Sequence, residues 1–158
     1  ILGMLIGIFK FSSVIAFLGL AIGIVLIKIA PEEQKPLEKY FDFARKIMLA
    51  LIFIFLLLYY YKNNFYFFTL VFYIIFVIFV EYKTSGLRKS MFIYSILGIL
   101  FFLGAANMNL FVIESSLILL YGAAASSLLY KKKKKNYPSI LFYNAVFLLI
   151  SNLLFLVK

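Results

Sequence analysis

The chain has 158 residues, of which 66% are hydrophobic, and its mean hydropathy of +1.09 exceeds what a soluble domain of this size can bury, so we expect an integral membrane protein. It contains no cysteine and no histidine, which excludes disulfides and thiolate chemistry and removes the commonest general base and metal ligand. We attribute the net charge of +10 to membrane topology and not to nucleic-acid binding, because the cations flank hydrophobic runs and no recognition motif accompanies them.

Six segments are apolar enough to cross a bilayer as helices, which takes about 20 residues at 1.5 Å each. Their apolar runs are continuous and lack the alternation of a membrane β-barrel. In chain order, the predicted spans cover approximately residues 11–30, 44–61, 65–82, 90–106, 110–130 and 139–157. The sequence therefore predicts an all-α integral membrane protein with one transmembrane domain over residues 1–158, a bundle of six helices joined by short loops.

The connections between these spans alternate in charge. Three are basic, residues 31–46, 83–89 and 131–138, whereas the tight turns at 62–64 and 107–109 are nearly neutral. Six spans place all three basic connections on one face of the membrane, which the positive-inside rule assigns to the cytoplasm. Both ends of the chain are then expected on the opposite side.

The first basic connection contains a segment, residues 36–46, that we predict to be a short amphipathic helix on the inner leaflet. Its apolar residues Leu37, Tyr40, Phe41 and Ala44 recur at three- and four-residue spacing. The segment either binds anionic lipid or a soluble partner, or it simply leads into the next span, which is the simpler interpretation. The candidates for contact with anionic lipid are Arg45, Lys46, Lys131, Lys132, Lys133, Lys134 and Lys135. A lysine run more often only anchors topology.

A tandem repeat of hairpins is a further hypothesis. Arg45-Lys46 precedes one pair of predicted spans, and Arg88-Lys89 precedes the next pair. The simpler explanation is that any short-looped bundle obeying the positive-inside rule carries cations at every second turn.

Glu114 is a carboxylate about one turn inside the predicted fifth span, in the outer leaflet. Ionisable groups within spans usually face the bundle interior and mark a pathway or relay. Lys10 begins the first span at the same depth, so we predict a Lys10–Glu114 ion pair or a hydrogen-bonded shell from Ser115, Ser116 and Asn152. Alternatively, Glu114 stays protonated and exchanges protons or cations, or its side chain extends to the headgroups and has no function.

Small residues mark where helices can approach closely in lipid. The candidates for helix packing are Gly19, Gly23, Gly98, Gly104, Gly122 and Ala124. Asn144, in the sixth span, is predicted to hydrogen-bond across helices. The spans at 44–61 and 65–82 hold mostly large apolar residues, so we expect this hairpin to face lipid while the other four spans form the packed centre.

Three classes of function fit this sequence. The first is a small transporter, channel or transporter subunit, whose ligand or ion pathway includes Glu114, Ser115, Ser116, Lys10, Asn152 and Asn144. The second is a structural or accessory subunit of a larger membrane complex. A lipid-modifying enzyme is least favoured, because the acids in the first basic connection match no ligand motif. We expect no cofactor and no metal. The expected partners are the lipid bilayer and other membrane subunits or further copies of the chain, with no nucleic acid.

Overall fold

The computed structural model describes residues 2–130 and 136–157, and these residues contain helices and turns but no strand. The elements are α1 (Leu2–Ile29), the short 3-10 helix η1 (Pro31–Glu33), α2 (Gln34–Tyr60), α3 (Asn64–Lys83), α4 (Gly86–Gly104), α5 (Met108–Leu129), α6 (Tyr137–Asn144) and α7 (Val146–Val157). Helices are the expected answer to long apolar runs, because each helix pairs its own backbone groups without water.

Short polar residues end one helix and start the next. The side chain of Asn63 accepts a hydrogen bond from the Tyr66 amide at 3.4 Å, which caps α3. Asn107 does the same for α5, accepting from the amides of Asn109 at 2.9 Å and Leu110 at 3.2 Å. Between α3 and α4, Gly86 has a φ of +63°, a conformation that glycine adopts without steric cost.

Among the described residues, five helices are long and apolar enough to cross a membrane: Gly7–Ile29, Asn64–Lys83, Gly86–Gly104, Met108–Leu129 and Tyr137–Val157, the last combining α6 and α7. The protein is thus consistent with a multi-pass helical membrane protein. The sixth predicted span, 44–61, falls in the second half of α2 and is not among the five. The number six therefore stays a prediction.

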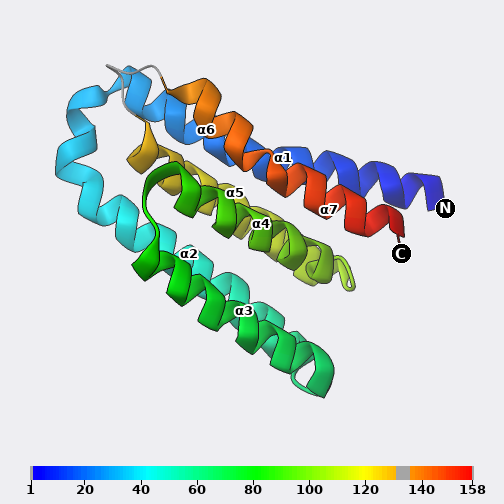
Figure 1. Ribbon diagram of the computed structural model, residues 1–158. Helices are drawn as coiled ribbons and strands as arrows, with labels where there is room; N and C mark the ends of the chain where they lie inside the picture. Colours follow the sequence, from blue (N-terminus) through cyan, green and yellow to red (C-terminus); the bar gives the residue numbers. More distant parts are fainter. Residues whose placement is uncertain (1, 131–135, 158) are drawn as a thin grey trace.

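The elements connect alternately at two ends of the bundle (Figure 1). The connection between α1 and α2 lies at the same end as the one between α3 and α4. The described chain ends, Leu2 and Val157, lie at the other end. This alternation is what hairpin-connected spans require, and it gathers charged segments at one end.

Helix α5 lies at the centre and packs against α1, α2 and α4. The prediction that the hairpin of residues 44–61 and 65–82 lies at the periphery of the bundle is therefore only partly right. Helix α3 is mostly exposed, but α2 buries Leu49, Ile52, Phe53 and Leu56. The prediction for α2 is wrong because large apolar side chains interlock between helices as well as small ones do, so the absence of glycine does not send a helix to the periphery.

The segment 36–46 is not a separate helix, because it forms the first turns of α2. Its neighbour Gln34 donates hydrogen bonds from its side-chain amide to the carbonyls of Ser127 and Tyr130, each at 2.7 Å. These bonds satisfy carbonyls at the end of α5, where the helix has no partners of its own. They dock the start of α2 on the bundle.

Glycine lets α1 and α5 approach until their backbones touch. A Cβ on Gly19 would overlap the Leu119 carbonyl, and one on Gly23 would overlap the Ala123 carbonyl. On the facing helix α5, a Cβ added to Gly122 would lie 3.0 Å from the backbone nitrogen of Leu20. The remaining packing candidates also lie at contacts: Gly98 faces Phe147 and Ile150 of α7, Gly104 faces Glu114, and Ala124 is 7% exposed.

Candidate functional site

Glu114 lies in the second turn of α5 and points at the end of α4. Its side chain is completely enclosed, with 0% exposure. The space for it exists because residue 104 is glycine: a Cβ there would lie 3.0 Å from the Glu114 Cγ atom. Within the described part of the chain, neither carboxyl oxygen, Oε1 or Oε2, has a hydrogen-bond partner. A carboxyl group in this state is rare, because a buried polar group normally has a partner.

The predicted partners of Glu114 lie elsewhere. Lys10 is exposed and forms no ion pair with the enclosed Glu114. The neighbouring Phe9 faces the core instead, stacked on Phe155 with ring centroids 4.1 Å apart. The Lys10–Glu114 pair is therefore not formed. Sharing a depth in the membrane does not make two residues neighbours, since the direction of each side chain around its helix decides what it meets.

The predicted polar shell is also absent around Glu114. Ser115 and Ser116 donate to carbonyls of their own helix, those of Phe111 at 2.7 Å and Val112 at 2.9 Å. Asn152 donates to the Ser13 hydroxyl at 3.2 Å and thereby joins α7 to α1. Positions next to Glu114 in sequence are rotated by about 100° per residue around the helix, so they cannot share its face.

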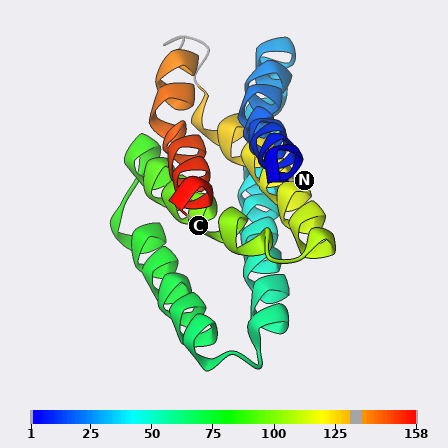
Figure 2. The same cartoon turned by 90° about the vertical axis from the view of Figure 1, so that its right-hand side faces the viewer.

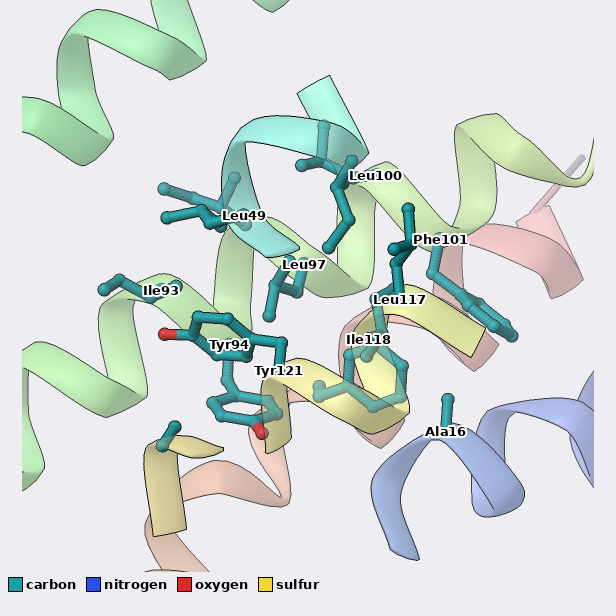
Figure 3. Packing of buried hydrophobic residues seen from close by; sticks show 14 of the residues in the cluster. Ala16, Leu49, Ile93, Tyr94, Leu97, Leu100, Phe101, Leu117, Ile118 and Tyr121 are labelled. Atoms are coloured by element: carbon teal, nitrogen blue, oxygen red, sulfur yellow. The ribbon is translucent and has the colours of Figure 1, made fainter. Parts of the chain in front are cut away.

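From Glu114 towards the end of the bundle where α3 connects to α4, an apolar layer fills the space between α4 and α5. Figure 3 shows Leu97, Leu100 and Phe101 of α4 interlocked with Leu117 and Ile118 of α5. All five side chains are buried, each at most 9% exposed. This layer separates Glu114 from the next polar groups along the bundle.

Those next polar groups are two buried tyrosines. The rings of Tyr94 and Tyr121 lie side by side with their centroids 5.7 Å apart (Figure 3). The Tyr94 hydroxyl has no partner, whereas the Tyr121 hydroxyl interacts with the guanidinium of Arg45. Tyr121 thus lies beside a charged cluster at the end of the bundle where α2, α3 and α4 meet, whereas the Tyr94 hydroxyl lies against Gly122, where α5 meets α1.

The centre of that cluster is Arg45, which is only 7% exposed. It donates from Nη1 to Glu81 Oε1 at 2.6 Å and from Nη2 to Asp42 Oδ1 at 2.9 Å. Lys89 pairs with Glu81, and Lys46 pairs with Asp42 at 2.5 Å. These five side chains, which we call the ion-pair cluster, tie α2, α3 and α4 together.

Sequence reasoning missed this cluster. It treated Arg45 as a candidate contact for anionic lipid, but the structure encloses the guanidinium between two carboxylates, so that role is corrected. The available signal was Glu81, an acid at the end of a span that faces the basic ends of its neighbours. In Asp42, burial raises the pKa, but hydrogen bonds from Lys46 and Arg45 and their charges outweigh burial and hold the pKa below its ordinary value.

Two hollows flank the ion-pair cluster. A cavity of about 210 Å³ lies between α2, α4 and α5. The polar residues that line it are Glu38, Asp42, Arg45, Lys89, Ser90 and Tyr121. A larger groove of about 640 Å³ lies between α2 and α3.

Asn144 is fully buried at the junction of α6 and α7. Its Oδ1 accepts a hydrogen bond from the Ser90 hydroxyl of α4 at 2.8 Å, and its Nδ2 donates to the Ile140 carbonyl at 2.7 Å. The amide therefore joins two helices, as predicted for such a residue in a membrane, and its place beside the helix break leaves it far along the bundle from Glu114.

The predicted lipid contacts at Lys131 to Lys135 lie outside the described residues. Within the part of the chain that the structure describes, no three acidic side chains gather to hold a metal ion. No family model matches the sequence, and comparisons with curated proteins and with solved structures found no match. Any function must therefore be argued from the residues themselves.

Proposed function

We propose that this chain is a small multi-pass membrane transporter, or a subunit of one, in which Glu114 binds and releases a proton or a cation. One observation carries the proposal: the Glu114 carboxyl is fully enclosed and neither oxygen has a partner. An ionised carboxylate without a hydrogen bond or counter-ion is costly in an apolar interior. Glu114 must therefore take up a positive charge before it is enclosed.

The proposal includes a topology of six spans, with residues 44–61 of α2 as the second. The basic connections face the cytoplasm, and both described ends face the opposite side. The alternation of basic and neutral connections supports this topology. So does the placement of the basic connections α1–α2 and α3–α4 at one end of the bundle and of the neutral turns α2–α3 and α4–α5 at the other (Figure 1).

A transport route also needs access from both sides. From the charged end, the 210 Å³ cavity reaches Ser90 and Tyr121. The apolar layer then blocks the way to Glu114. The structure supports the interpretation of a closed state, in which helix movement must open the layer before an ion passes.

The alternative is an accessory subunit, in which Glu114 is enclosed only by packing and never exchanges its proton. The large exposed apolar surface of α3 fits a subunit interface as well as it fits lipid. The two functions differ in one measurable respect: only the transporter moves charge across a membrane through Glu114.

Reconstituted vesicles test the proposal. A hydrophobic carbodiimide attacks protonated carboxyls in apolar surroundings, so we expect dicyclohexylcarbodiimide to modify Glu114 and mass spectrometry to locate the adduct there. With a membrane potential imposed, a pH-sensitive dye inside the vesicles reports proton entry. Glu114→Gln should abolish both signals, Glu114→Asp should retain part of the flux, and Glu32→Gln, at an exposed acid, should retain all of it.

Equal flux through the wild type and Glu114→Gln contradicts the proposal. A wild-type chain that is labelled at Glu114 but carries no flux, and that purifies together with other membrane subunits, also contradicts it and supports the accessory role.

A further inference from the structure

The groove between α2 and α3 is amphipathic. Above their shared turn, α3 leans away from α2 (Figure 2), and the two helices meet again through the ion-pair cluster. The walls of the groove are apolar: Leu49, Ala50, Phe53, Ile74, Val77 and Ile78. Its polar residues all belong to one end: Asp42, Lys46, Glu81, Tyr82 and Lys89.

At the polar end of the groove, the carboxylates are already occupied while the ammonium groups keep unused donors. Each of the four carboxylate oxygens of Asp42 and Glu81 already accepts from Arg45, Lys46 or Lys89. Three cations thus share two carboxylates, which leaves one positive charge in excess. An ammonium group has three N–H donors, so Lys46 and Lys89 each keep donors that the cluster does not use.

The accessibility of these two lysines fits the same interpretation. The side chain of Lys46 is 58% exposed and that of Lys89 is 20% exposed, whereas that of Arg45 is 8% exposed. The exposed Tyr82, at the same end of the groove, adds a hydroxyl donor. The arrangement calls for an acceptor-rich, negatively charged group at the end of an apolar body.

We propose that this groove binds an anionic phospholipid, with its phosphate between Lys46 and Lys89 and an acyl chain along the apolar walls. Phospholipid is the occupant because the groove lies between two helices that carry long apolar exposed surfaces, which in a membrane face lipid. The charged end lies where headgroups lie, beside the basic connections. The site is distant from Glu114, at the opposite end of the bundle; it rests on the proposed topology of α2 and α3 but not on transport through Glu114.

A tryptophan reporter makes lipid binding measurable, because the chain has no tryptophan of its own. Tyr82→Trp places one indole at the groove and supplies an N–H donor in place of the hydroxyl, and brominated lipids that contact the indole quench its fluorescence. A matched reporter, Ile29→Trp, lies at an exposed position at the end of α1. This is the same end of the bundle as Tyr82, so the reporter senses bulk lipid at the same level. The full chain is reconstituted first with mixtures of brominated phosphatidylglycerol and plain phosphatidylcholine, and then with mixtures of plain phosphatidylglycerol and brominated phosphatidylcholine.

At the groove reporter, we expect phosphatidylglycerol to be preferred over phosphatidylcholine on the order of 25-fold, since two nearby ammonium groups each contribute about a fivefold gain and the gains multiply. At Ile29→Trp the preference should be close to that of the bulk mixture. Lys46→Gln with Lys89→Gln should remove the preference at the groove, and Lys46→Gln alone, at the more exposed lysine, should reduce it. Lys28→Gln with Lys39→Gln, two exposed lysines outside the groove, should leave it unchanged.

The acyl-chain part of the site has its own variant. Ala50→Phe fills the groove wall and should weaken quenching by both lipids, whereas Val25→Phe on the exposed face of α1 should not. Three results overturn the proposal: equal lipid preference at the two reporters, a preference that survives both lysine substitutions, or competition by millimolar inorganic phosphate with no effect of Ala50→Phe. The last result would assign the donors to a soluble phosphate.

Discussion

Gly104, the last residue of α4, leaves the space that the side chain of Glu114 occupies on α5. The Glu114 Cγ atom lies 3.0 Å from where a Cβ on residue 104 would be, and its Cβ lies 3.3 Å from the same point. Most real Cβ contacts are longer, so the two positions are sterically coupled. The enclosure of this buried carboxyl therefore depends on a glycine in a neighbouring helix.

The first prediction concerns this coupling. Gly104→Ala should lower the melting temperature in detergent micelles, because the added methyl group crowds Glu114, and overpacking of this kind costs about 1–3 kcal/mol. In an Glu114→Ala background, which shortens the facing side chain, the same substitution should cost much less. Circular dichroism on the four chains of this double-mutant cycle measures the coupling. Equal losses in both backgrounds would show that the two residues do not press on each other.

The second prediction concerns the contact of α1 with α5. Gly19→Ala should destabilise the protein strongly, since its Cβ would overlap the backbone carbonyl of Leu119, which cannot move aside as a flexible side chain can. A loss of at least 2 kcal/mol is expected, about the upper part of the range for overpacked positions. Gly7→Ala is the matched control, because a Cβ at Gly7 meets nothing within 4 Å. If Gly7→Ala had a lower melting temperature than Gly19→Ala, this account of the helix contact would be contradicted.

The third prediction concerns pH and Asp42. Because its folded pKa is lowered below the ordinary 3.8, the ionised form stabilises the fold, fully above pH 3.8 and progressively less as the pH falls through the folded pKa. Asp42→Asn should therefore be less stable than the wild type at neutral pH, and the difference should shrink below about pH 3.8. The effect should be modest, since the Asp42 side chain is 39% exposed and solvent screens its ion pairs.

Melting temperatures at several pH values check this. Glu32→Gln, at an exposed acid outside the ion-pair cluster, is the control and should follow the wild type throughout. If the difference in melting temperature between the wild type and Asp42→Asn stayed constant down to pH 2, the ionised carboxylate of Asp42 would not be the source of the stabilisation.

Part of the candidate site was visible in the sequence. Glu114 stands out because a carboxylate within an apolar run is expensive, and cost alone singles it out. Its partners were not predictable from depth. Lys10 shares its level but points outward, while Gly104, which carries no polar atom, is the residue that meets it. Nothing in a linear pattern indicates which glycine faces which acid.

The sequence by itself determined the class of structure: apolar runs of span length must become helices, because lipid offers the backbone no hydrogen bonds, and the short connections between them force neighbouring helices to run in opposite directions. Only the tertiary structure decided that α5 is central, that α2 packs inside, and that Arg45, Glu81 and Lys89 meet. The physical reason is that these outcomes depend on how each helix is rotated about its axis. That rotation is set by interlocking side chains from distant parts of the chain. It cannot be predicted from the sequence of a uniformly apolar helix, because such a helix has no amphipathic stripe.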